Sequence, residues 1–90
     1  MKIMKSPLEG LKVLELARVL AGPWAGQLLA DLGAEVIKIE SPIGDETRGW
    51  GEDSFNKNSS YFKCTNRGKY SLVADFKKKD DLEMVKNLAA

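Results

Sequence analysis

The chain has 90 residues, of which 43% are hydrophobic and 30% charged, and its 14 Lys and Arg against 13 Asp and Glu give a formal net charge of +1. This near balance gives no electrostatic reason to expect binding to nucleic acid or to a membrane surface. The absence of His removes the commonest general base and metal ligand, so we expect no metal site.

Cysteine content and hydropathy indicate in which cellular compartment the protein is expected. Cys64 is the single cysteine, which excludes an internal disulfide and is typical of a reducing compartment. No apolar run approaches the roughly 18 residues of a membrane span. No apolar segment follows the charges of Met1–Lys5, so no signal peptide is expected. We therefore expect a cytoplasmic protein.

A strand, a turn and a helix are predicted at the start of the chain. Leu11–Leu16 is a short apolar run between turn residues and predicts a short buried strand. An irregular stretch follows, and Gly22 is the expected N-cap of a helix whose first residue is Pro23, where the missing N–H costs nothing. The apolar face of this helix is expected to carry Leu28, Leu29 and Leu32.

A glycine and an apolar run predict how the helix ends. Gly33 should supply the left-handed stop, and Glu35–Glu40 predicts the second strand. Because only about two residues separate helix and strand, the two strands should be parallel with a right-handed crossover. Residues 11–40 thus predict a βαβ unit, whose ligand would lie at the turn Ala21–Pro23, beyond the carboxyl end of the first strand.

The rest of the chain predicts a loop, a strand and a helix. Residues 41–69 form a long loop, with one helical turn at Ser59–Lys63 and a turn at Asn66–Lys69. Tyr70–Phe76 alternates well enough for a third strand. A second helix is expected from near Asp80, whose charge suits a helix N-terminus. The predicted fold class is α/β, in the order β-α-β-loop-β-α.

A dinucleotide site is a poorly supported alternative. Glu40 follows the glycine turn by about 20 residues, the position of a ribose-binding acid in dinucleotide folds. The glycines, however, are spaced Gly22-x-x-x-Gly26 and not G-x-G-x-x-G. This spacing disfavours NAD.

Three segments in order carry a family resemblance: PLEGLKVLELARVLAGPWAGQLLADLGAEVIKIE, GDETRGWG and SSYFKCTNRGKYSLVADFK. Together they resemble the N-terminus of the class III CoA-transferases, the CaiB/BaiF family of formyl-CoA transferase, carnitine CoA-transferase and α-methylacyl-CoA racemase. The resemblance implies that residues 1–90 are the incomplete N-terminal piece of a Rossmann-like large domain. Within it lie the βαβ unit 11–40, the loop 41–69 and the strand and helix 70–90. Family members are implied to form interlocked homodimers.

The resemblance also implies a chemistry that these residues do not complete. The family's transferases move CoA between carboxylic acids, and an aspartate attacks the acyl-CoA thioester in covalent catalysis. The matching aspartate would fall beyond residue 90. The racemase branch uses a His and an Asp, and this chain has no His. The ligand implied is CoA or acyl-CoA, and no catalytic residue is assigned.

Part of a CoA site is implied by position. The backbone at Val19–Ala21 would line the pantetheine and thioester region, Ser41 stands where relatives often have a phosphate-binding Arg, and Ala74–Lys77 would contact adenine and ribose. The implied CoA-binding residues are Val19, Leu20, Ala21, Ser41, Ala74, Asp75, Phe76 and Lys77. Leu20 replaces a Gln of formyl-CoA transferase, which argues against a formyl or oxalyl substrate.

Further side chains have weaker assignments. Trp50 is either near the active site or packed over the sheet, and Arg48 is expected to pair with Asp45 or with a phosphate. The turn Asn66–Lys69 is implied to face the 3′-phosphate end of CoA. Two further residues have structural expectations: Arg18 is expected in a surface ion pair, and Cys64 in a buried or half-buried position.

Two functions remain open from the sequence. One is a truncated CoA-transferase that carries part of the CoA site and is inactive alone, as a gene-decay remnant or with a complementing downstream fragment. The other is a small non-catalytic module that binds a nucleotide or a partner protein. In either case, unpaired sheet edges and apolar faces predict low solubility or a molten state for the isolated chain.

Overall fold

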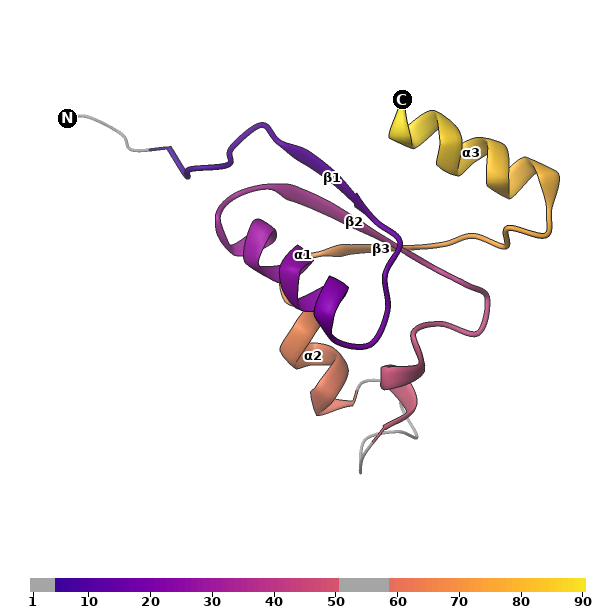
Figure 1. Ribbon diagram of the computed structural model, residues 1–90, viewed down its shortest axis with the longest axis horizontal. Helices are drawn as coiled ribbons and strands as arrows, with labels where there is room; N and C mark the ends of the chain where they lie inside the picture. The colour runs from indigo at the N-terminus through magenta and orange to yellow at the C-terminus, as the bar shows by residue number, and fades with distance from the viewer. Residues whose placement is uncertain (1–4, 51–58) are drawn as a thin grey trace.

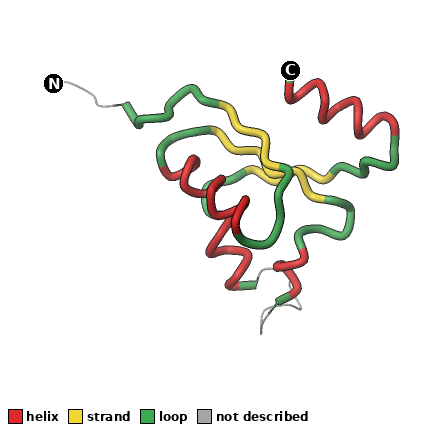
Figure 2. Tube along the Cα trace, viewed as in Figure 1, coloured by secondary structure: helices red, strands yellow, loops and turns green. Residues whose placement is uncertain are grey.

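The computed structural model describes residues 5–50 and 59–90, so Met1–Met4 and part of the predicted loop lie outside the described residues. Its three strands form one parallel sheet in the order β1-β2-β3. Helices lie on both sides of this sheet (Figures 1 and 2). The elements are β1 (Lys12–Glu15), α1 (Ala21–Asp31), β2 (Glu35–Glu40), the 3₁₀ helix η1 (Glu46–Gly49), α2 (Ser60–Asn66), β3 (Tyr70–Val73) and α3 (Lys79–Ala89). The α/β class and the incomplete Rossmann-like arrangement are confirmed.

The predicted βαβ unit is present with altered boundaries. β2 has the predicted bounds and pairs in parallel with β1, and Gly33 has a φ of +105° after α1. The helix begins at Ala21 with Leu20 at the N-cap position, so the prediction that Gly22 caps it is wrong. Pro23 lies within the first turn, where backbone N–H groups have no acceptor in the helix, and its missing N–H therefore still costs nothing.

The predicted loop 41–69 contains two short helices. η1 lies within it, and α2 extends to Asn66 where a single turn was predicted. Ser59 caps α2 by accepting a hydrogen bond from the Phe62 N–H at 3.1 Å. β3 ends at Val73 and not at Phe76, because its partner β2 ends at Glu40 in register with Val73. The chain is therefore irregular at Ala74–Lys77.

The central strand has one charged face and one apolar face. Lys38 and Glu40 share the face on the α1 side, and Lys38 is paired in register with Glu15 of β1. Ile37 and Ile39 share the other face. The apolar core lies there, under α3, and consists of Ile39, Ala74 and Val85 with Leu14, Ile37, Leu72 and Met84 packed against them.

The leucine face predicted for α1 does not face the sheet. Leu28 is 58% exposed and Leu32 38%, and only Leu29 of the three is half-buried, whereas the buried residues of α1 are Pro23, Gly26 and Gln27. The reason is that the sheet presents the charged side chains of Glu15 and Lys38 to the helix. The helix therefore packs on them with small and polar residues such as Gly26 and Gln27. The predicted burial of Leu16 and Cys64 is also wrong, since both are exposed.

Gly26 allows α1 to approach the charged face closely. A Cβ at this position would lie 1.9 Å from Glu15 Oε1 and 3.3 Å from Lys69 Cε. Both side chains are buried and ion-paired to each other at 2.7 Å, so neither can move away freely. No helix in the described part of the chain is long and apolar enough to cross a membrane.

Replacing Gly26 tests this close approach. Gly26→Ala should lower the free energy of unfolding by about 1–3 kcal/mol, because the added methyl overpacks a buried contact. This loss should outweigh the higher helix propensity of Ala. Urea denaturation measures it, with Gly49→Ala as the matched control, since a Cβ there meets nothing within 4 Å. A Gly26→Ala chain as stable as the control would contradict the packing of α1.

Candidate functional site

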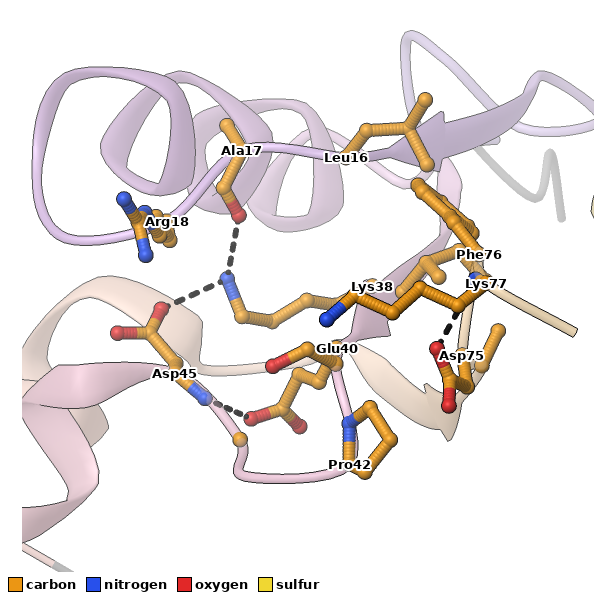
Figure 3. Close-up of a pocket in the computed structure, with 14 residues that line it drawn as sticks. Leu16, Ala17, Arg18, Lys38, Glu40, Pro42, Asp45, Asp75, Phe76 and Lys77 are labelled. Carbon is orange, nitrogen blue, oxygen red and sulfur yellow. Dashed lines mark hydrogen bonds and ion pairs between the residues drawn. The ribbon is translucent and has the colours of Figure 1, made fainter.

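A pocket of about 420 Å³ lies where the three strands end. Its walls come from the segments that follow β1, β2 and β3 (Figure 3). Ligands of parallel α/β sheets bind at this carboxyl edge. The lining residues are Leu16, Ala17, Arg18, Lys38, Ile39, Glu40, Ser41, Pro42, Gly44, Asp45, Ala74, Asp75, Phe76 and Lys77.

The structure brings together five of the eight predicted CoA-binding residues. Ser41 and the segment Ala74–Lys77 line the pocket from β2 and β3. Val19, Leu20 and Ala21 are absent from the lining and form the entry to α1 beside it. Binding of CoA by these residues stays a prediction, since the pocket fixes only their place.

Lys38 is the central side chain that the sequence analysis missed. Its ammonium is 3.0 Å from each of three oxygens, Glu15 Oε2, Ala17 O and Asp45 Oδ2. The Lys38 side chain is only 1% exposed. The sequence does carry a signal for its burial. Lys38 lies within the apolar run of a strand in a parallel sheet, and such strands are covered on both faces.

Asp45 links the β2–η1 loop to Lys38 and to the turn before α1. Its Oδ1 accepts hydrogen bonds from the Thr47 N–H at 2.9 Å and the Thr47 hydroxyl at 2.8 Å. Burial acts to raise the pKa of Asp45, but the Thr47 hydrogen bonds and Lys38 outweigh it and hold that pKa below its usual value. Asp45 is therefore a buried, ionised anchor of the pocket wall.

Glu40 forms a second buried ion pair, with Arg48. Arg48 donates to the Glu40 carboxylate from Nε at 2.7 Å and from Nη2 at 2.8 Å, and its guanidinium lies 3.9 Å from the centroid of the Phe62 ring. Glu40 was not among the partners predicted for Arg48, which were Asp45 and a phosphate. The Ser71 hydroxyl and the Asp45 N–H also donate to Glu40. Burial opposes ionisation, yet these donors lower the pKa of Glu40 to about 2.

Two cations remain accessible at the pocket. Arg18 is 74% exposed and lies 3.6 Å from Glu46, which confirms the expected surface ion pair. Lys77 is exposed on the opposite wall in Figure 3. Asp75 accepts a hydrogen bond from the Lys77 N–H at 3.0 Å. Arg18 and Lys77 are thus the cations that an anionic ligand could meet, and the Asp75 carboxylate lies on the same wall as Lys77.

The basic turn before β3 does not face the pocket. Lys69 is 2% exposed and donates to Glu15 at 2.7 Å, and burial lowers its pKa against the opposing effect of that carboxylate. Arg67 pairs at 2.7 Å with Asp31 on the surface. The pocket lining includes neither side chain, and their contact with the 3′-phosphate of CoA stays a prediction.

Trp50 follows η1 and lies against α2. It packs edge-to-face on Tyr61 of α2, with ring centroids 4.9 Å apart. The pocket lining does not include it. In residues 5–50 and 59–90 no group of three His, Cys, Asp or Glu side chains is arranged to hold a metal ion.

The lowered pKa of Glu40 predicts an acid-dependent loss of stability. The carboxyl has its ordinary pKa of 4.5 when unfolded and about 2 when folded, so its contribution is complete above pH 4.5 and is lost as the pH falls toward 2. Urea midpoints measured across this range should fall with pH. Glu40→Gln should flatten that dependence by up to about one proton. Equal slopes for Glu40→Gln and wild type would contradict the assignment.

Comparison with known proteins supports the resemblance. The model of CoA-transferase family III matches residues 8–90. Succinate–glutarate CoA-transferase of Agrobacterium fabrum is 54% identical over 91 residues, which cover 93% of this chain and 23% of the relative. Succinyl-CoA:glutarate CoA-transferase of Mus musculus is 52% identical over 85 residues, with 93% and 20% covered.

Solved structures have the same fold over this region. A CaiB/BaiF family protein from Brucella suis superposes with a TM-score of 0.83 at 50% identity, covering 94% of this chain and 24% of that protein. The chain thus spans 20–24% of the length of these relatives. On the family match and these identities, the chain belongs to CoA-transferase family III.

Proposed function

We propose that this chain forms part of the CoA-binding site of a family III CoA-transferase, here called the binding corner, which is the pocket at the carboxyl ends of β1, β2 and β3. We also propose that the chain is inactive in CoA transfer without the rest of that fold. The observation that carries the proposal is the pocket at the carboxyl edge of the sheet, in a chain of this family. Its volume lies in the range of small-molecule sites, which is enough for part of CoA.

The charges at the pocket support an anionic ligand. The buried carboxylates of Asp45 and Glu40 are each neutralised, by Lys38 and Arg48. Arg18 and Lys77 extend toward solvent at the mouth. A phosphate or acyl carboxylate of acyl-CoA at the mouth would be able to pair with either of these two side chains.

The outer face of α1 supports the need for further protein. Leu20, Trp24 and Leu28 are 43%, 63% and 58% exposed, at a spacing of four residues. Together with Leu32 they form an apolar stripe, the kind of surface that marks a protein contact. We propose that the remaining three quarters or so of a family III fold, in the same or another polypeptide, cover this stripe.

A non-catalytic module that binds a nucleotide or a partner protein is the second candidate. The alternative rests on the same pocket and stripe, since neither requires catalysis. It differs in predicting that the chain remains functional without any further segment of the family fold.

Titration with CoA tests the binding corner. Isothermal calorimetry of the 90-residue chain should detect CoA binding. Lys77→Gln should raise the Kd about three- to fivefold, because an exposed charge contributes less than about 1 kcal/mol. Lys86→Gln, an exposed lysine of α3 away from the pocket, is the matched control. Absence of CoA binding, or equal losses in both variants, would overturn the binding assignment.

Complementation tests the requirement for the rest of the fold. The chain should co-purify with a polypeptide comprising the Agrobacterium fabrum relative beyond the matched region, and only the pair should transfer CoA from succinyl-CoA to glutarate. Trp24→Asp should abolish co-purification because it puts a charge in an apolar contact. Ile43→Asp, at a side chain 85% exposed and outside α1, should not. Turnover by the chain alone would refute the proposed dependence.

A further inference from the structure

Val19 has a backbone conformation that its side chain disfavours. Its φ is +71°, and within the described ranges every other residue with positive φ is Gly. A β-branched residue in the left-handed region is a genuine outlier. Such a conformation persists only where surrounding contacts determine it, and it is often found at functional sites.

Asp45 holds Val19 in this conformation from one side. The Val19 N–H donates to Asp45 Oδ2 at 3.3 Å. The Asp45 side chain is fully buried and is fixed through its other oxygen by Thr47. It therefore cannot turn to solvent and release the Val19 N–H without leaving buried donors unpaired.

Lys38 holds the same turn from the other side. Its ammonium contacts both the Ala17 carbonyl oxygen and Asp45 Oδ2 at 3.0 Å, as Figure 3 shows. The residues on either side of Arg18 are thus both tied to one buried ion pair. Arg18 itself stays exposed at the pocket.

We infer that Lys38 and Asp45 are positioning residues that clamp the Ala17–Val19 turn in a strained form and thereby present Arg18 and the adjoining pocket wall to the anionic groups of CoA. The inference rests on the proposed function for its ligand. The clamp itself rests on the hydrogen bonds and on the conformation of Val19. In this role both residues act through the turn, because their side chains are almost fully buried although they lie in the pocket wall.

The clamp predicts a specific rescue. Asp45→Asn removes the charge that holds Lys38 and weakens acceptance from Val19, so Val19 should leave positive φ and CoA affinity should fall about tenfold or more. Gly adopts positive φ without a clamp. Val19→Gly should therefore restore most of the CoA affinity in the Asp45→Asn background, although it cannot restore the lost ion pair.

The experiment has three measurements on each variant. They are the φ of residue 19 from a crystal or NMR structure, the Kd for CoA by calorimetry, and the urea midpoint. Asp31→Asn is the matched control, since it removes an exposed carboxylate paired with Arg67 away from the pocket. Its Kd should stay within about twofold of wild type. If Asp45→Asn does not fold, Thr47→Val loosens Asp45 more mildly, because it removes one of the hydrogen bonds to that carboxylate, and it should lower CoA affinity by a smaller factor.

The outcomes separate the clamp from the proposed function. Positive φ at Val19 in the Asp45→Asn variant overturns the clamp, even if CoA binds, and so does an unchanged CoA affinity in the Thr47→Val variant. A loss of CoA affinity that Val19→Gly does not restore, and that follows the urea midpoint, reduces Lys38 and Asp45 to stabilising residues. If wild type binds no CoA, the proposed function fails, and the φ of residue 19 still decides whether the clamp exists.

Discussion

The buried ammonium of Lys38 is the constraint on which the rest of the structure depends. A charge without partners in the interior would cost several kcal/mol, and Lys38 meets this cost only when three separate segments supply oxygens. These are β1 through Glu15, the following turn through Ala17, and the β2–η1 loop through Asp45. The sheet and the pocket wall must therefore form together, because the same ion is satisfied by both.

The charged layer also determines how α1 lies on the sheet. Glu15 joins Lys38 to Lys69, and Gly26 of the helix sits directly on that pair. A helix with large residues on this side would be held too far away to cover the ions. The apolar side chains of α1 are consequently left outside, so the interaction that builds the pocket also creates the exposed stripe of Leu20, Trp24, Leu28 and Leu32.

Sequence reasoning succeeded where spacing alone determines the result. The short connection at Gly33 and the run Glu35–Glu40 require a parallel βαβ unit, and the structure has it. The leucine face of α1 was mispredicted because amphipathic reasoning assumes an apolar layer beneath a helix. Ser41 and Ala74–Lys77 lie at the pocket because parallel strands end at one edge. No local pattern predicts a left-handed Val19, whose conformation depends on Asp45, 26 residues away.

The same buried ion pairs limit the chemistry that the two carboxylates can perform. A carboxylate nucleophile needs an oxygen that can reach the thioester and is not stabilised by other partners. Asp45 receives donors on both oxygens, and Glu40 is held by Arg48 and Ser71 with its pKa lowered to about 2. These two carboxylates are thus committed to shaping the pocket and are poor nucleophiles. The two carboxylates that shape the proposed acyl-CoA site are for that reason unsuited to attack a thioester.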